Sequence, residues 1–228
     1  MDSYFAKVNG VKEVGDNTQL LITTQENIYN KIINLNRDNR LNVELKLNDG
    51  RTITTEQRKK IYATIRDIAD YIGDAPEYFK EFMKVNYCIE RGEEYFSLSD
   101  CSITTAREFI NYLIEFALSN DIPLQDLAIN RTDDIDRYLY QCIKYRVCAI
   151  TGKKNADIHH CTGSRVGMGR NRQTINHSEL EIIALSREWH TKVHQQGEEE
   201  IFKKYGIYGI KVNRETLKLI GLNVSDIN

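Results

Sequence analysis

Residues 156–160 read Ala-Asp-Ile-His-His, and residues 185–194 read Leu-Ser-Arg-Glu-Trp-His-Thr-Lys-Val-His. His190 and His194 stand four positions apart, which places both imidazoles on one face of a helix, where they can bind a single cation. On a strand, the tandem pair His159-His160 points its rings to opposite sides, so that one can bind a metal while the other acts as a base. All five histidines of the 228-residue chain lie in this region, and we therefore predict a metal site rather than scattered structural histidines.

The region between Cys148 and His194 resembles the HNH endonuclease family, whose ββα-metal core is a β-hairpin packed on a metal-binding helix. It begins with Cys148-Ala-Ile-Thr-Gly-Lys and continues through the tandem pair and a Gly/Arg loop to the helix. The resemblance implies that His159, His190 and His194 are metal ligands, and that His160 is the general base that takes a proton from the attacking water. A neutral imidazole, with a pKa of about 6.5, suits that role at neutral pH.

The resemblance also implies a divalent cofactor, generally Mg²⁺ or Mn²⁺, that neutralises charge on the scissile phosphate and on the departing 3′ oxygen. Three imidazole ligands suit zinc, nickel or manganese better than magnesium, because imidazole is a softer ligand than carboxylate. The sequence therefore predicts a divalent metal and leaves its identity open, with Zn²⁺ as an alternative to the ions usual in the family.

The chain departs from the family at the structural zinc that many HNH proteins hold with two C-x-x-C pairs. The corresponding pairs here are Cys148-x-x-Thr151 and Ser186-x-x-Trp189, which together keep one sulfur. A zinc held by four thiolates is excluded, and we expect Trp189 to fill the space as part of the core.

A second departure concerns the middle Asn of the family pattern. The aligned position looks like Glu181, whereas Asn176 and His177 lie just upstream and can substitute by orienting the hairpin or joining the site. We take His177 as a second catalytic candidate, and the middle role stays open among these three residues.

The stretch Gly163-Ser-Arg-Val-Gly-Met-Gly-Arg-Asn-Arg172 lies between the tandem pair and the helix. Its glycines permit a close approach of the backbone to a ligand, and guanidinium groups suit phosphate oxygens. Such runs are often solvated loops. Beside a nuclease site, however, Arg165, Arg170 and Arg172 are candidates for a clamp on the DNA backbone without base readout.

The amino-acid composition indicates the cellular compartment of the protein more than its function. The chain has 31 basic and 33 acidic residues, a net charge of −2 and a pI of about 6.2, so any DNA surface must come from local asymmetry. We find no signal peptide and no apolar run long enough to span a bilayer, and we expect no membrane partner. The five cysteines are then expected to be reduced, buried thiols in a cytoplasmic protein of a bacterial host.

The first half predicts strands followed by helices. Alternating or clustered apolar residues indicate strands at residues 4–8, 19–24 and 42–47, the last closed by Asn48-Asp-Gly. Four helices follow, each with an apolar stripe expected in the core: from Thr54 or Thr55 (Ile61, Ile65, Ile68, Ala69, Ile72), from Ala75-Pro76 (Tyr78, Phe79, Phe82, Met83), from Ser102 or Thr104 (Phe109, Ile110, Leu113, Ile114, Ala117) and from Asp133-Asp134 (Tyr138, Leu139, Cys142, Ile143).

The fold class expected is therefore α+β. We place a strands-then-helices domain at residues 1–132 and a ββα-metal HNH nuclease domain at residues 133–228. Beyond the metal helix we expect a short helix near Gly197-Glu-Glu-Glu, a glycine-rich strand or turn and a closing helix. Consecutive glutamates are poorly suited to touch DNA, and we assign no chemistry to them.

The first half also resembles the phage recombination-mediator family known as Orf or NinB, over roughly residues 40 to 125. The resemblance rests on the stretch from Arg51 through Thr54-Thr-Glu-Gln-Arg to Asp67, and on Tyr95-Phe-Ser-Leu-Ser-Asp-Cys before a long helix. It implies a homodimer that binds single-stranded DNA and single-strand binding protein. DNA-surface candidates by this resemblance are Arg51, Arg58, Lys59, Lys60 and Arg107, although such side chains can also form an ordinary solvated helix face.

These expectations combine in a phage-type DNA recombination or replication protein. It would be a metal-dependent HNH endonuclease acting on single-stranded or branched DNA, with a DNA-binding N-terminal domain. The alternative is a non-catalytic recombination mediator whose histidines hold a structural metal. The intact pair His159-His160 favours the enzyme, because a structural site would use a closed four-ligand shell and would not need His160 as a base.

Overall fold

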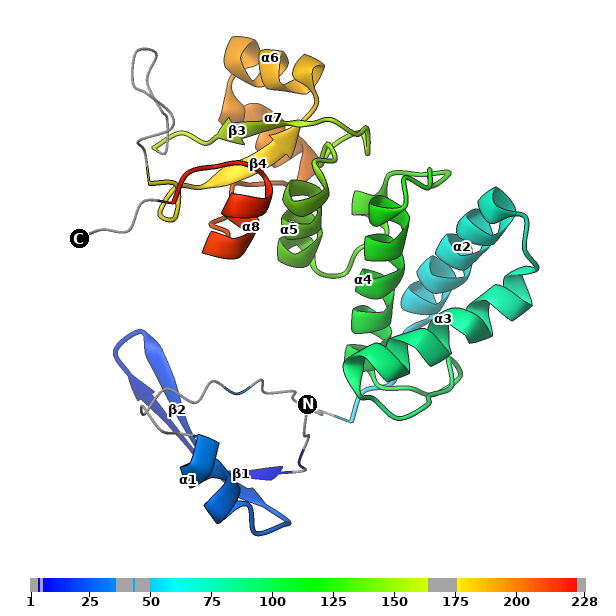
Figure 1. Ribbon diagram of the computed structural model, residues 1–228, viewed down its shortest axis with the longest axis vertical. Coiled ribbons are helices and arrows are strands. Elements are labelled where there is room, and N and C mark those ends of the chain that lie inside the picture. The colour runs from blue at the N-terminus through cyan, green and yellow to red at the C-terminus, as the bar shows by residue number, and fades with distance from the viewer. Residues whose placement is uncertain (1–3, 5, 36–42, 44–49, 164–175, 225–228) are drawn as a thin grey trace. The chain divides into compact units, whose positions relative to one another are not determined.

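The computed structural model describes residues 4, 6–35, 43, 50–163 and 176–224 (Figure 1). The chain divides into two compact units, one with residues 1–47 and 88–94 and the other with residues 48–87 and 95–228. Strands and helices occur in both, so the predicted α+β class is confirmed, with a strand hairpin first and helices after it.

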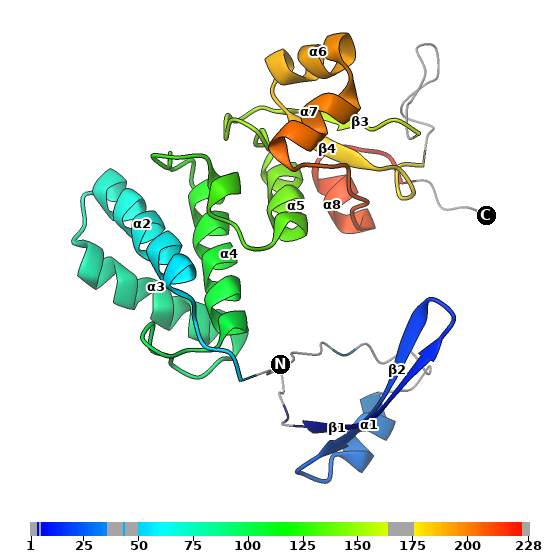
Figure 2. The same cartoon turned by 180° about the vertical axis from the view of Figure 1, so that it is seen from behind.

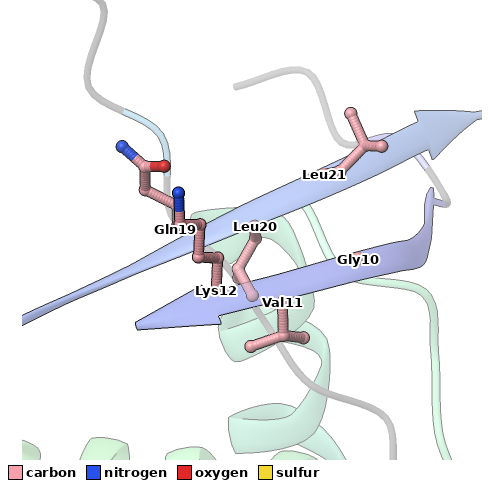
Figure 3. A pocket seen from close by; sticks show the side chains of 6 residues that line it. All are labelled: Gly10, Val11, Lys12, Gln19, Leu20 and Leu21. Carbon is pink, nitrogen blue, oxygen red and sulfur yellow. The ribbon is translucent and has the colours of Figure 1, made fainter. Parts of the chain in front are cut away.

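The first unit contains a β-hairpin and a short helix. Strands β1 (Ala6–Val14) and β2 (Asn17–Thr24) pair antiparallel, and helix α1 (Tyr29–Leu35) follows. The first two predicted strands are therefore present, whereas the third, at residues 42–47, lies outside the described residues except for Val43. An open hollow on the hairpin is lined by Gly10, Val11, Lys12, Gln19, Leu20 and Leu21 (Figure 3).

The second unit starts with helices whose ends follow local sequence signals. Helix α2 (Thr55–Ile72) begins after Thr54, whose hydroxyl accepts a hydrogen bond from the backbone N–H of Gln57 while the Gln57 side chain accepts one from the Thr54 backbone. It ends at Gly73, which has a φ of 79°. The next elements are α3 (Pro76–Arg91), of which residues 76–87 belong to this unit, α4 (Ile103–Ser119), the 3₁₀ turn η1 (Ala128–Asn130) and α5 (Ile135–Tyr145).

The core of these helices consists of the apolar stripes that the sequence indicates. Ile61, Ile65 and Leu113 are fully buried, and α2 packs on α4, which packs on α5. Burying each such side chain stabilises the fold by about 1.5–3 kcal/mol. Three stripe residues expected in the core are instead exposed: Ile72 (46%), Tyr78 (66%) and Phe82 (47%).

The exposure of Tyr78 and Phe82 follows from the orientation of helix α3. Helix α3 turns Phe79, Met83 and Tyr87 into the core, each no more than 2% exposed. Tyr78 and Phe82 lie on the next row of the helix surface, and among the described residues no element covers that row. The sequence shows where a helix has an apolar stripe, but it does not show how many rows of that stripe another element of the fold will bury.

Polar contacts join the first helices to those beyond residue 132. The Glu115 carboxylate on α4 accepts hydrogen bonds from Lys144 and Tyr145, which lie at the end of α5. Lys60 on α2 forms an ion pair of 2.6 Å with Asp133, just before α5. These contacts cross the predicted boundary between residues 132 and 133.

The last part of the chain is a small sheet between helices. Strands β3 (Asp157–His160) and β4 (Ile182–Leu185) pair antiparallel, and Ile210 bridges to the other edge of β4 through two backbone hydrogen bonds with Ile182. Helices α6 (Arg187–Gln196) and α7 (Glu198–Tyr205) lie on one side of the sheet, and α5 and α8 (Arg214–Leu219) lie on the other, as both views show (Figures 1 and 2). Among the described residues, no helix combines the length and apolar character needed to cross a bilayer.

Candidate metal centre

Three histidines meet where β3 contacts α6. His159 comes from the strand, and His190 and His194 come from the helix; each offers a ring nitrogen, and these nitrogens all lie within 4.8 Å of one another. The three ring centroids are 5.0 Å apart in each pair. The i,i+4 spacing on α6 thus produces the shared face that the sequence predicts.

Helix α6 is positioned by its own N-cap. The Ser186 hydroxyl accepts a hydrogen bond from the backbone N–H of Trp189, and the helix starts directly after the buried end of β4 at Leu185. Trp189 was expected in the core, but it is only half-buried and packs edge-on against Tyr205 of α7, at 5.1 Å between centroids. Leu185 and Cys148, by contrast, are both fully buried.

The environment keeps two of these imidazoles neutral. Burial lowers the pKa of His159, which is 1% exposed, and outweighs the opposing hydrogen bond to Glu198. Burial also lowers the pKa of His190, against the opposing effect of Asp157. Because a histidine must be deprotonated at the nitrogen that binds a metal, both shifts favour metal binding at neutral pH.

The donor set fits a divalent metal. Nδ1 of His159 is buried and makes no hydrogen bond to any described residue, although an orphaned buried nitrogen costs free energy. Convergent imidazoles with such a nitrogen are what a zinc-type or manganese-type ion requires, and no carboxylate belongs to this set of three.

Two carboxylates contact these histidines, and neither was predicted from the sequence. Asp157 on β3 contacts Nδ1 of His190 at 3.5 Å and Nε of Arg187 at 3.1 Å. Glu198, the first residue of α7, contacts Nε2 of His159 at 3.0 Å. Asp157 could have been found, because it stands two positions before His159 and so shares its side of the strand.

His160 lies away from the three-histidine cluster, as expected for a tandem pair on a strand. Its ring is 5.3 Å from that of His177, and it is half-buried whereas His159 is fully buried. The buried His177 donates a hydrogen bond from Nδ1 to the backbone carbonyl of Asn223 at 3.0 Å. Nε2 of His177 is buried and has no hydrogen-bond partner among the described residues.

The other two candidates for the middle position have different surroundings. The Asn176 side chain accepts hydrogen bonds from the backbone and hydroxyl of Ser178, which shapes the turn before β4. Glu181 is exposed, and its backbone carbonyl accepts a hydrogen bond from Cys161. Of the three, His177 is the residue whose ring lies against His160.

The predicted DNA-binding residues are spread over the chain. Arg165, Arg170 and Arg172 lie outside the described residues. Arg51, Lys59 and Arg107 are exposed, Arg58 donates to the Ser99 carbonyl at 2.9 Å, and Lys60 is held by Asp133 with 17% of its side chain exposed.

Comparison with known proteins identifies a family. A family model described as "Putative HNHc nuclease" matches residues 23–223, far more than half of the chain. The match includes the histidine cluster, and it also spans residues 40–125, for which the resemblance to recombination mediators stays a prediction. No curated protein and no solved structure matches the chain.

Proposed function

The chain belongs to this HNHc nuclease family, and on that premise we propose that it is a metal-dependent endonuclease that hydrolyses phosphodiester bonds in DNA. The observation that carries the proposal is the arrangement around β3. His159 meets His190 and His194 in one cluster, while its neighbour His160 stands apart from them beside His177. A cluster with a separate histidine next to it provides both a metal site and a base.

The three clustered histidines would hold the cation, and His160 and His177 would handle the proton. When bound, a divalent metal neutralises charge on the scissile phosphate and on the departing 3′ oxygen. The three-imidazole set supports zinc or manganese more than magnesium. Because the family generally uses Mg²⁺ or Mn²⁺, both ions have to be tested beside Zn²⁺.

His160 acts as the general base in this proposal. A neutral ring nitrogen takes a proton from water as the water oxygen attacks phosphorus, the bond from phosphorus to the 3′ oxygen breaks, and that oxygen leaves. The half-buried setting of His160 leaves it open to a substrate, whereas the fully buried His159 is closed off. His177 would orient the His160 ring, since the two rings are in contact and His177 is itself fixed by the Asn223 carbonyl.

The DNA partner is proposed at two levels. A nuclease of this family implies DNA as substrate. In this proposal Arg165, Arg170 and Arg172 bind the DNA backbone. Single-stranded or branched DNA, single-strand binding protein, a homodimer and a role in phage recombination or replication follow from the mediator resemblance and form the finer part of the proposal.

A plasmid-nicking assay tests the proposal. The protein is stripped with EDTA, dialysed and then supplied with Mg²⁺, Mn²⁺ or Zn²⁺. Nicking that disappears on stripping and returns with one of these ions supports the enzyme. Metal binding without nicking of double-stranded, single-stranded or branched DNA supports the alternative, a mediator with a structural metal.

A further inference from the structure

Glu198 holds three parts of the metal centre together. One carboxylate oxygen lies 3.0 Å from Nε2 of His159, and the two oxygens accept a shared hydrogen bond from the Thr162 backbone N–H at 2.9 and 3.0 Å. The side chain is only 14% exposed. Its contacts therefore join the start of α7 to β3 and to the residues that follow β3.

A single glycine places Glu198 in this position. Gly197 ends α6 and precedes α7 with a φ of 103°, a backbone conformation that other residues rarely adopt. The chain turns there immediately after the helix that carries His190 and His194. The residue after the turn therefore faces back toward His159.

The contact decides which nitrogen of His159 carries the proton. A carboxylate only accepts hydrogen bonds, so the Nε2 atom facing Glu198 must be the protonated one. Nδ1 then holds the lone pair, and this buried atom makes no hydrogen bond to any described residue. The Thr162 backbone N–H donates to the same group, and convergent donors of this kind favour the ionised carboxylate as their acceptor.

We propose that Glu198 is a positioning residue that fixes His159 with its proton on Nε2 and its Nδ1 lone pair directed to the metal. This role presupposes the proposed metal centre. It distinguishes Glu198 from the other two glutamates of the run Glu198-Glu-Glu, because only Glu198 would orient a metal ligand. Carboxylates that accept a proton from a metal-binding histidine fix its tautomer and raise its basicity. Removing such a partner lowers metal affinity by about 10–100-fold.

The neighbouring glutamates provide a matched control. Glu199 and Glu200 belong to the same turn of α7 and carry the same charge, but both are exposed. Replacing Glu199 changes the charge of the turn without touching His159. A difference between E198A and E199A thus isolates the contact with His159 from the field of the glutamate run.

The test uses the full chain with zinc as the probe. Calorimetric titration should give E198A a zinc affinity about 10–100-fold below that of the wild type, with E199A unchanged. E198Q should fall between them, because its amide oxygen still accepts the Nε2 proton but lacks the charge. ¹⁵N–¹H spectra of the imidazoles report protonation and zinc ligation at each nitrogen, and in the wild type they should show His159 protonated at Nε2 and ligated through Nδ1.

The outcomes separate this inference from the proposed function. Equal zinc affinity of E198A and the wild type, or His159 ligated through Nε2, would overturn the positioning role. Should E198A fail to fold, the wild-type spectra and E198Q still decide the matter. Wild-type protein that binds zinc through His159 Nδ1 but cleaves no DNA would sustain the inference and remove the nuclease proposal.

Discussion

At the scale of single residues, neighbouring histidines differ in their surroundings. His159 and His160 are adjacent in sequence, yet one is enclosed by His190, His194 and Glu198 and the other contacts His177. The pleat of β3 produces the separation, because successive side chains leave a strand on opposite sides. Roles in the centre follow from these surroundings rather than from residue type.

The ligand assignment leads to a first prediction. His190→Ala and His194→Ala should each weaken zinc binding strongly and remove the rise in melting temperature that zinc gives the wild type, because a bound metal stabilises the folded state by mass action. His177→Ala should change zinc affinity little, since its ring contacts His160. Calorimetry and thermal unfolding with and without zinc measure both effects. A loss of affinity in His177→Ala equal to that in His194→Ala would make His177 a fourth ligand.

The sequence predicts the centre to the extent that its geometry is local. The pair His190 and His194 follows from helix periodicity, and the tandem pair follows from strand alternation. Glu198 is four positions beyond His194, but Gly197 breaks the helix between them, so helix spacing cannot reveal its contact. That contact depends on the direction in which α7 leaves the turn, which is decided by tertiary packing.

At the scale of elements, the sequence predicted the helix caps and most of the buried stripes, but not how wide each buried face would be. Thr54, Ser102 and Asp134 begin their helices as the sequence indicates, because each side chain accepts a hydrogen bond from a backbone N–H within its own first turn. Burial of Tyr78 and Phe82 was wrongly expected, since it depends on what packs against α3. The hydrogen bonds of a helix cap are thus encoded in a few neighbouring residues, whereas the burial of a helix face depends on the packing of the whole unit.

The α4–α5 contact leads to a second prediction, on pH. Burial raises the pKa of Glu115, but hydrogen bonds from Lys144 and Tyr145 outweigh it, so the folded-state pKa lies below the ordinary value. Its stabilising contribution is complete above the unfolded-state pKa of about 4.3 and is lost as the pH falls through the folded-state value. Glu115→Gln should therefore lower the free energy of unfolding by about 1–3 kcal/mol at pH 7 and by less at pH 3.

Urea unfolding of the wild type and Glu115→Gln at both pH values measures this difference. Glu108→Gln on the same helix is the control, because its carboxylate is more exposed and contacts only the neighbouring Arg107, at 3.6 Å, among the ion pairs of the described residues. It should change stability by no more than about 0.5 kcal/mol. A Glu115 effect that stays constant from pH 7 to pH 3 would contradict the role of its charge.

At the scale of the whole molecule, some basic side chains form ion pairs within the fold, whereas others are exposed and can contact DNA. Lys60 is paired with Asp133, whereas Lys59 beside it is exposed. We expect Lys60→Gln to lower stability with little effect on DNA binding. Lys59→Glu should leave stability near the wild-type value and weaken single-stranded DNA binding, reducing the slope of log K against log salt by about 1 if it contacts a phosphate.

Fluorescence anisotropy with labelled oligonucleotides across a salt series, beside thermal unfolding, measures both variants in the full chain. The reverse pattern, with Lys60→Gln changing the salt slope and Lys59→Glu changing only stability, would mean that the ion pair with Asp133 opens for DNA. If the wild type binds no single-stranded DNA even at low salt, the mediator resemblance of the first half fails.

The central claim is that the clustered histidines bind metal while His160 performs the chemistry, and one paired measurement on His160→Ala tests it most directly. Plasmid nicking and calorimetric metal titration are run on the same preparations of wild type and variant. We expect the variant to keep the wild-type metal affinity and melting temperature while its nicking rate falls by at least about 10²–10⁴-fold, the usual contribution of a general base. Nicking at the wild-type rate, or loss of metal binding together with activity, would contradict the account.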